Sequence, residues 1–188
     1  MKIRLVAVML LFAAFAAGGT EVAGVKIDDR ARVGSAELAL NGAGLRKRVF
    51  LQVYAIGLYL PQKSSTPAAI LEQAGPKRVA IHMLRSVGAD DFSAALADGI
   101  RANHSEAEAR ALEPRIKELA AIMAELKEAK KGMAIALDWQ PPAGTVMVVD
   151  GAARGKPIQG EDFYRALLRI WIGDKPVQDD LKKALLGG

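Results

Sequence analysis

NGAGLRKRVFLQVYAIGLYL occupies residues 41–60 and carries the clearest structural signal in the chain. In residues 50–60 the apolar side chains fall on both alternating positions, which predicts a strand that is covered on both faces. Gly42 and Gly44, just before this strand, predict a turn that holds Arg46 in one direction. The sequence therefore predicts that the positive charge of Arg46 is held in one direction just before the start of a buried strand.

Other segments predict shorter strands and several helices. Strands are expected at residues 25–27, 36–40, 78–85, 133–139 and 145–149, and helices at 67–73, 92–100, 116–126, 163–171 and 181–185. Ser105 and Glu108 fit a capping box at a helix start, whereas Pro114 is expected to break or restart the helix. Strands, then a block of helices, then a hairpin with more helices indicate one α+β domain with a mainly antiparallel sheet.

The first twenty residues have the pattern of a secretory signal peptide. Lys2 and Arg4 precede a run of apolar residues, and Ala14-Phe15-Ala16 fits a cleavage motif. The apolar run is shorter than the roughly 20 residues that a membrane-spanning helix needs, and no later segment is long and apolar enough to cross a bilayer. We therefore expect cleavage at about residues 16–20, export to the periplasm or out of the cell, and one mature domain formed by residues 21–188.

The residue types narrow the possible chemistry. The chain has no cysteine and only two histidines, His82 and His104, so thiol catalysis is excluded and a zinc site with several such ligands is poorly supported. His82 lies in an apolar strand and is expected to belong to the core. Without residues 1–20 the chain keeps 24 basic and 21 acidic side chains, with no long basic block, which argues against nucleic-acid binding. We expect no cofactor and no metal, and no feature identifies a protein partner.

Three motifs follow one another along the chain: G-A-G-L-R, then F-L-Q-V-Y-A-I-G-L-Y-L, then a late I-W-I-G-D-K-P with L-K-K-A-L-L. In order and spacing they resemble the chalcone isomerase-like family, most closely its exported bacterial branch, from about Gly24 to Gly187. The resemblance implies a large, mainly antiparallel sheet covered by a layer of helices, with a ligand cleft between the two layers. It also implies that the arginine after the glycines, here Arg46, points into this cleft.

The same resemblance speaks against the plant enzymes' isomerase chemistry. It places Tyr54, Phe92, Gly99 and Ile170 where those enzymes have a threonine, a tyrosine, an asparagine and a hydroxyl residue. Of the catalytic set only Arg46 is retained. Loss of a single donor to a developing oxyanion can lower a rate ~10²–10³-fold, so efficient chalcone cyclisation is not expected.

Fatty-acid-binding members of this fold hold a carboxylate with an arginine and a tyrosine. Arg46 and Tyr54 can supply that pair here, with Phe92 as a third ligand-binding residue. The leading hypothesis is thus an exported, non-catalytic protein that binds a small apolar acid. Two alternatives stay open. One is an isomerase or intramolecular lyase in which Arg46 polarises the carbonyl of a chalcone- or enone-like substrate, and the other is an interaction module without a small ligand.

Overall fold

A computed structural model describes residues 19–188 of the chain, so most of the expected signal peptide lies outside the described residues. Gly19 and Thr20 begin a short hairpin of β1 (Gly19–Val22) and β2 (Val25–Asp28). No helix in residues 19–188 is long and apolar enough to cross a membrane.

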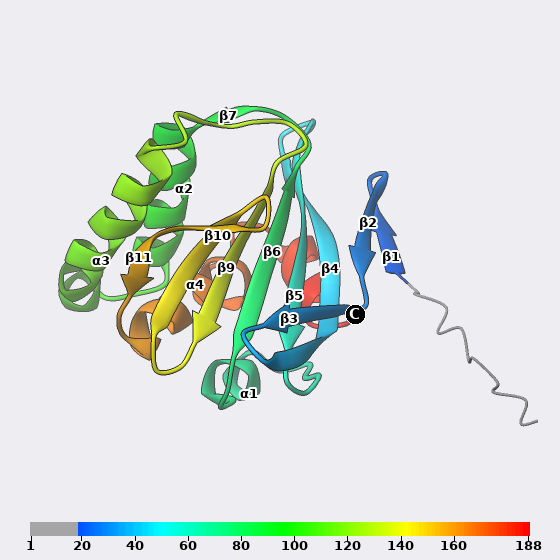
Figure 1. Ribbon diagram of the computed structural model, residues 1–188, viewed down its shortest axis with the longest axis horizontal. Coiled ribbons are helices and arrows are strands. Elements are labelled where there is room, and N and C mark those ends of the chain that lie inside the picture. The colour runs from blue at the N-terminus through cyan, green and yellow to red at the C-terminus, as the bar shows by residue number, and fades with distance from the viewer. Residues whose placement is uncertain (1–18) are drawn as a thin grey trace, which may run out of the picture.

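A seven-stranded sheet forms the body of the domain, and each of its strands is antiparallel to its neighbours (Figure 1). Neighbouring strands of this sheet follow one another along the chain, with one exception. The strands of residues 77–83 and 134–140 are neighbours although a segment with two long helices separates them in the sequence. The order across the sheet is β11 (Ala152–Ile158), β10 (Gly144–Val149), β9 (Ala134–Gln140), β6 (Lys77–Met83), β5 (Leu51–Leu60), β4 (Ala36–Arg48) and β3 (Arg30–Val33). A further two-stranded pair joins β7 (Val87–Gly88) to β8 (Glu128–Ala129).

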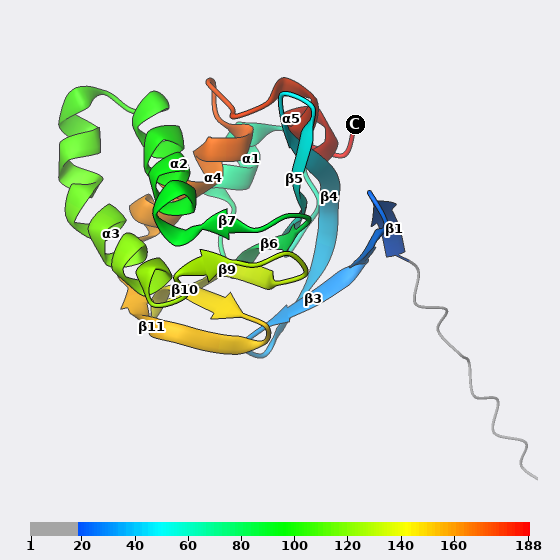
Figure 2. The same cartoon turned by 90° about the horizontal axis from the view of Figure 1, so that it is seen from above.

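The helices cover one face of this sheet, as the view from above shows (Figure 2). They are α1 (Pro67–Glu72), α2 (Ala89–Ala102), α3 (Glu106–Ala124), α4 (Glu161–Ile172) and α5 (Asp179–Leu185). The α+β fold with a large antiparallel sheet under a helical layer, expected from the sequence, is confirmed.

The long strand β5 has two buried faces from Tyr54 to Leu60, as its sequence predicts, but the prediction is wrong at the start of the segment. Phe50 lies in the turn before β5, and both Phe50 and Leu51 are exposed, because no other element covers the tip of this hairpin. Tyr54, Ile56 and Leu58 belong to the large core between the sheet and the helices. Ala55 and Tyr59 point the other way, into a smaller core beneath β1, β2 and β3. The Tyr59 hydroxyl donates a 2.8 Å hydrogen bond to the carbonyl oxygen of Asp28 in that smaller core. Successive side chains of a strand point to opposite faces, so the apolar residues at alternate positions of β5 pack into two separate cores.

The glycine turn predicted before this strand is wrong. Residues 41–48 continue β4 without interruption, and the chain turns only at Val49 and Phe50. Gly42 and Gly44 are needed for packing instead, because α5 lies directly on this part of β4. A Cβ at Gly44 would lie 2.6 Å from Cδ1 of Leu181, and one at Gly42 would lie 2.8 Å from the carbonyl carbon of Leu185.

Two further expectations about the elements differ from the structure. Helix α3 runs through Pro114 rather than breaking there, since Pro114 is exposed and the helix is stabilised by the predicted capping box of Ser105 and Glu108. Strand β11 was not expected, because its residues AARGKPI are mostly small or charged and almost all exposed, so they show no alternation of large apolar side chains.

Candidate functional site

Arg46 and Tyr54, both predicted as ligand-binding residues, lie directly opposite each other on β4 and β5. Side chains of directly opposite residues in an antiparallel pair point to the same face of the sheet. Because Tyr54 belongs to the core under the helices, Arg46 also points toward the helical layer. The structure therefore brings the predicted arginine and tyrosine together on the face where a ligand cleft was expected.

Phe92 and Trp171 cover Tyr54 from the helical layer. The Phe92 ring, on α2, meets the Tyr54 ring edge to face, with 6.3 Å between centroids and an angle of 80° between the planes. The indole Nε1 of Trp171, on α4, donates a 3.0 Å hydrogen bond to the Tyr54 hydroxyl. The exposed fractions of the three residues are 6% for Tyr54, 4% for Phe92 and 1% for Trp171, so this aromatic group is closed to solvent.

The Arg46 guanidinium is held at the edge of this group by the chain just before α5. Its Nη1 donates a 2.6 Å hydrogen bond to the carbonyl oxygen of Lys47 and a longer one, 3.4 Å, to Oε1 of Gln178. Gln178 Oε1 also accepts a 2.9 Å bond from the Lys47 amide, and its Nε2 donates to the Leu45 carbonyl at 3.2 Å. Gln178 thus satisfies the backbone of β4 where the pairing register with β5 shifts.

Arg46 has no carboxylate partner within 4 Å in the part of the chain that the structure describes. It is half-buried, so its positive charge is only partly hydrated. A partly buried cation without an anion favours any ligand that supplies one.

The electrostatics of Tyr54 keep its hydroxyl neutral and able to donate. Burial raises the pKa of Tyr54, while the hydrogen bond from Trp171 and the positive charge of Arg46 act in the opposite direction. The Tyr54 oxygen accepts from Trp171, and no described residue accepts the proton that it carries. The Tyr54 hydroxyl and the Arg46 guanidinium therefore lie on the same face of the sheet. Among the described residues, none accepts the hydroxyl proton and none supplies a carboxylate to the guanidinium.

The positions expected from plant isomerases hold a packing contact instead of catalytic groups. Gly99 on α2 and Ile170 on α4 are buried and face each other, since a Cβ at Gly99 would lie 2.8 Å from Cγ2 of Ile170. Two helices cross closely where a polar amide and a hydroxyl would be required. Among the described residues, the polar groups near Arg46 are the Lys47 carbonyl, the Gln178 amide and the Tyr54 hydroxyl, which accepts from the Trp171 indole.

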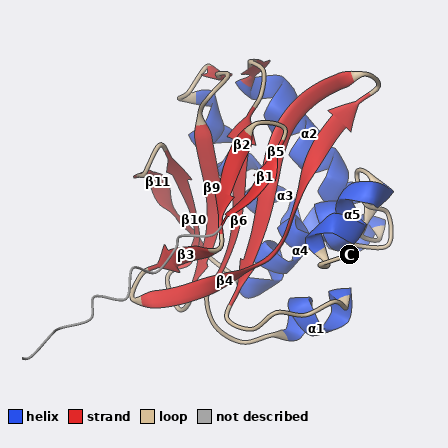
Figure 3. Cartoon of the chain, turned by 90° about the vertical axis from the view of Figure 1, so that its right-hand side faces the viewer, coloured by secondary structure: helices blue, strands red, loops and turns tan. Residues whose placement is uncertain are grey.

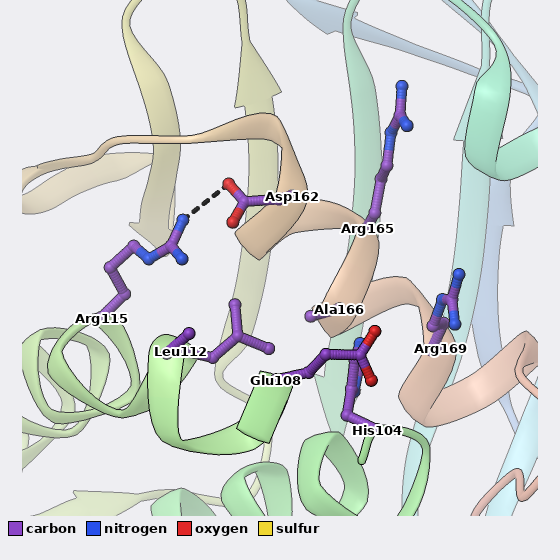
Figure 4. A pocket seen from close by; sticks show the side chains of 9 residues that line it. His104, Glu108, Leu112, Arg115, Asp162, Arg165, Ala166 and Arg169 are labelled. Carbon is purple, nitrogen blue, oxygen red and sulfur yellow. Dashed lines mark hydrogen bonds and ion pairs between the residues drawn. The ribbon is translucent and has the colours of Figure 1, made fainter. Parts of the chain in front are cut away.

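Two hollows are found elsewhere on the molecule. One of about 230 Å³ lies between α3 and α4 and is lined largely by charged residues such as Glu108, Arg115 and Arg169 (Figure 4). The other, of about 650 Å³, lies beside β3 and β4, between Thr20 and Lys63. Neither is lined by Arg46, Tyr54 or Phe92. Since Tyr54 and Phe92 are buried, the cleft expected at these residues is closed in this structure.

A methionine lies next to the closed site. Met83 lies directly opposite Tyr54 on the neighbouring strand β6, and its backbone N–H donates to the carbonyl of Met133. Met83 and Met123 belong to the same buried cluster as Tyr54 and Phe92, and Met133 packs against it. Methionine is unbranched and adaptable, which suits a core that must rearrange around a guest.

Trp171 and Gln178 were not predicted as part of the site. Trp171 was expected only to line a helix, although it stands in the late motif I-W-I-G-D-K-P that supports the family resemblance. That motif was the available signal. Gln178 carried no signal, because its role depends on where α5 docks on β4.

Comparisons with known proteins agree with this architecture. A family model described as chalcone isomerase-like matches residues 19–187. Among solved structures, a fatty-acid binding protein of Arabidopsis thaliana is similar, with a TM-score of 0.68 and 14% sequence identity, covering 87% of this chain and 92% of that one. A search of curated proteins found no match.

Proposed function

The chain belongs to the chalcone isomerase-like family, and we propose that it binds a small apolar acid of fatty-acid type, with Arg46 as the anchor of the carboxylate. The observation that carries this proposal is a half-buried cation without an anion, beside a hydroxyl whose proton has no acceptor among the described residues. The Arg46 guanidinium and the Tyr54 hydroxyl lie on the same face of the sheet, at the edge of an apolar and aromatic core.

A carboxylate is the ligand group that satisfies both donors. Its two oxygens accept a bidentate pair of hydrogen bonds from a guanidinium, and a charge-assisted bond of this kind is about twice as strong as a neutral one. In the free protein Arg46 is held only by the Lys47 carbonyl and by a long contact to Gln178. Both of these partners are neutral, so a carboxylate supplies the negative charge that the guanidinium lacks.

The apolar tail is proposed to run from Arg46 along the helix-facing side of β5. Each buried methylene contributes ~0.8 kcal/mol, so a twelve-carbon tail supplies ~10 kcal/mol gross. Association costs of ~4–15 kcal/mol then leave a weak to moderate affinity. Because the site is closed, the tail must also displace side chains such as Phe92 or Met83, which lowers the affinity further. The printed function of the Arabidopsis structural neighbour, fatty-acid binding, supports this choice of ligand class.

Native mass spectrometry of the protein purified from its host tests the proposal, together with titration of straight-chain acids from eight to eighteen carbons. We expect saturable binding of the acids and weak or no binding of the matching alcohols, which have the tail but lack the carboxylate. Empty protein together with no saturable acid binding would contradict the proposal. Equal binding of acids and alcohols would remove Arg46 as the anchor while leaving an apolar site.

The closed packing of Tyr54, Phe92 and Trp171 favours a second candidate function, an interaction module without a small ligand. In that case the core serves only stability, and the function lies on the surface. Binding of acids and amide-exchange protection separate the two candidates. If the acid enters the core, amides of α2 and β5 change their protection when it is added, whereas a closed module shows no such change.

Export is part of the same proposal. The N-terminal pattern of residues 1–20 supports it. Expression of the complete sequence in a bacterium, followed by fractionation and N-terminal sequencing, is expected to give a periplasmic or secreted protein that starts at about residues 17–21. Retention of an intact N-terminus in the cytoplasm would contradict export.

A further inference from the structure

The tip of the β4–β5 hairpin is apolar and open to solvent. Val49 is 81% exposed, Phe50 94% and Leu51 53%, and within residues 19–188 these three are the large hydrophobic residues that stand out on the surface. Figure 3 shows the hairpin as a long curved ribbon whose tip projects from the body of the domain. Three consecutive exposed apolar side chains at a projecting tip form a small wedge.

The backbone of this tip is unfavourable for the residues that it carries. Arg48 pairs with Leu51, so Val49 and Phe50 form a two-residue turn, and Val49 has φ +57°. Hairpin turns of this length favour glycine or asparagine at positive φ, and a β-branched residue is rare there. The chain therefore accepts both backbone strain and exposed apolar surface at one place. Such combinations concentrate at functional sites.

Basic side chains surround the wedge. Lys47 and Arg48 flank it on β4. Arg85 and the pair Lys130-Lys131 lie at the same end of the sheet, because Tyr54 is opposite Met83 and the amide of the residue after Lys131 donates to the Met83 carbonyl. All five basic residues are exposed, and none has a carboxylate within 4 Å among the described residues.

We propose that this tip, Val49-Phe50-Leu51 with its basic surround, docks the protein on an anionic lipid surface. An apolar wedge with Phe at its end fits the headgroup and acyl boundary of a bilayer, and unpaired Lys and Arg side chains around it attract anionic headgroups. The charge pattern supports this partner over a second copy of the chain, since two such tips would place like charges together. The inference stands apart from the proposed acid binding, because it uses none of the residues Arg46, Tyr54 or Phe92.

Vesicle co-sedimentation without any added acid tests the inference. The experiment uses the protein purified from its host after export, and all variants have the same N-terminus. Wild type is expected to bind vesicles of 30% phosphatidylglycerol in phosphatidylcholine at low salt, and to bind pure phosphatidylcholine at least tenfold more weakly. Salt at 0.5 M is expected to weaken the binding, because it screens the headgroup charge.

Two variants separate the wedge from the charges. The double substitution Val49→Gly and Phe50→Ser is expected to lower vesicle partitioning at least tenfold, although it relieves the strain at Val49 and so raises the melting temperature. Arg48→Glu with Lys131→Glu is expected to abolish the preference for phosphatidylglycerol. Lys63→Glu, an exposed lysine just past the opposite end of β5, is the matched charge control and should bind nearly as wild type.

Three results would overturn the inference. Wild type that stays in solution with phosphatidylglycerol vesicles is one, and binding that the wedge variant leaves unchanged is the second. The third is a dimer by size-exclusion chromatography that the wedge variant converts to monomer without any vesicle binding, which would assign the tip to self-association. Acid affinity in solution is measured on the same proteins. It should be equal in wild type and the wedge variant, so failure of either proposal is recognised separately.

Discussion

The indole of Trp171 and the hydroxyl of Tyr54, 117 positions apart in the chain, form a buried 3.0 Å hydrogen bond that ties α4 to β5. Tyr54→Phe leaves the indole N–H without its acceptor, and we expect it to lower the free energy of unfolding by about 1–3 kcal/mol. A double-mutant cycle with Trp171→Phe, measured by urea unfolding, should show a coupling of at least about 0.5 kcal/mol.

Tyr59→Phe is the matched control for this cycle. Its hydroxyl donates to the Asp28 carbonyl on the opposite face of the sheet. The effect of Tyr59→Phe on the free energy of unfolding should add to that of Trp171→Phe within about 0.5 kcal/mol. Additivity of Tyr54→Phe with Trp171→Phe as well would mean that the bond contributes nothing.

Charge-conserving substitution at Arg46 tests the anchor. Arg46→Lys keeps the positive charge but loses the planar fork that matches a carboxylate. We expect it to fold normally and to bind medium-chain acids at least ~10-fold more weakly, about 1.4 kcal/mol, by titration calorimetry. Arg46→Leu should bind more weakly still and melt no lower when empty, because a partly buried unpaired charge is removed. Tyr54→Phe should lose the equivalent of one hydrogen bond to a charged group, ~1.5–3 kcal/mol of binding energy.

Arg48→Lys, two positions along β4 and exposed, is the control for these binding experiments. It should leave acid affinity within about twofold of wild type. Equal affinity in wild type and Arg46→Lys would refute the anchor.

Gly42→Ala is expected to loosen the docking of α5. A Cβ there would meet the Ala184 carbonyl oxygen and lie 2.8 Å from the carbonyl carbon of Leu185, both of them backbone groups that cannot rotate away. Overpacking of this kind costs ~1–3 kcal/mol. Gly88→Ala, at φ −55° with the nearest atom 3.6 Å from the added Cβ, should be neutral or slightly stabilising. Thermal melts of the two variants decide the point, and similar melting temperatures would contradict the packing role of Gly42.

Lys77 is a buried cation whose replacement is expected to stabilise the fold. Its side chain is 1% exposed, its Nζ has no hydrogen-bond partner within residues 19–188, and Glu161 Oε1 lies 3.8 Å away. Burial lowers the pKa of Lys77, so the folded state disfavours the charged form. Lys77→Met should raise the free energy of unfolding at pH 7 by roughly 1–4 kcal/mol.

The direction of the pH dependence tests whether the buried charge of Lys77 destabilises the fold. The cost of the lysine is full at low pH, where both states are protonated, and falls as the pH rises through the lowered folded pKa toward 10.5. The advantage of Lys77→Met should therefore shrink in alkaline urea titrations. Lys63→Met, at an exposed lysine, should stay within about 0.5 kcal/mol of wild type at every pH.

His82 is expected to make the fold less stable in acid. It is half-buried on β6, opposite Ala55, and burial lowers the pKa of His82 while the charge of Asp28 acts in the opposite direction. Below the unfolded value of 6.5 the unfolded chain takes up the proton first, so stability is lost as the pH falls from 6.5. His82→Gln should lose less stability between pH 7 and 5. At pH 8 His82 is neutral in both the folded and the unfolded state. The difference in stability between wild type and His82→Gln at this pH therefore gives the cost of the substitution itself. Parallel pH profiles would contradict the prediction.

Local pattern was sufficient for most of the elements. The two-sided alternation of residues 50–60 predicted strand β5, because a strand's period of two repeats within a few residues. Ser105 and Glu108 predicted the start of α3, since a capping box needs residues only three positions apart. His82 was expected in the core, and the structure leaves it half-buried on β6. An apolar stretch of sequence predicts that a residue lies in a strand, but not how deeply its side chain is buried.

The sequence by itself thus determined the strands and helices whose signals repeat over short distances, together with the family to which their order points. Only the tertiary structure decided what Gly42 and Gly44 are for. A glycine is equally compatible with a turn and with a strand against which another element packs, and the choice depends on α5, about 140 residues away. The same holds for Arg46 and Tyr54, whose respective partners Gln178 and Trp171 come from the far end of the chain. Contacts at that separation leave no periodic trace in the sequence, because they are set by how completed elements pack and not by their local conformation.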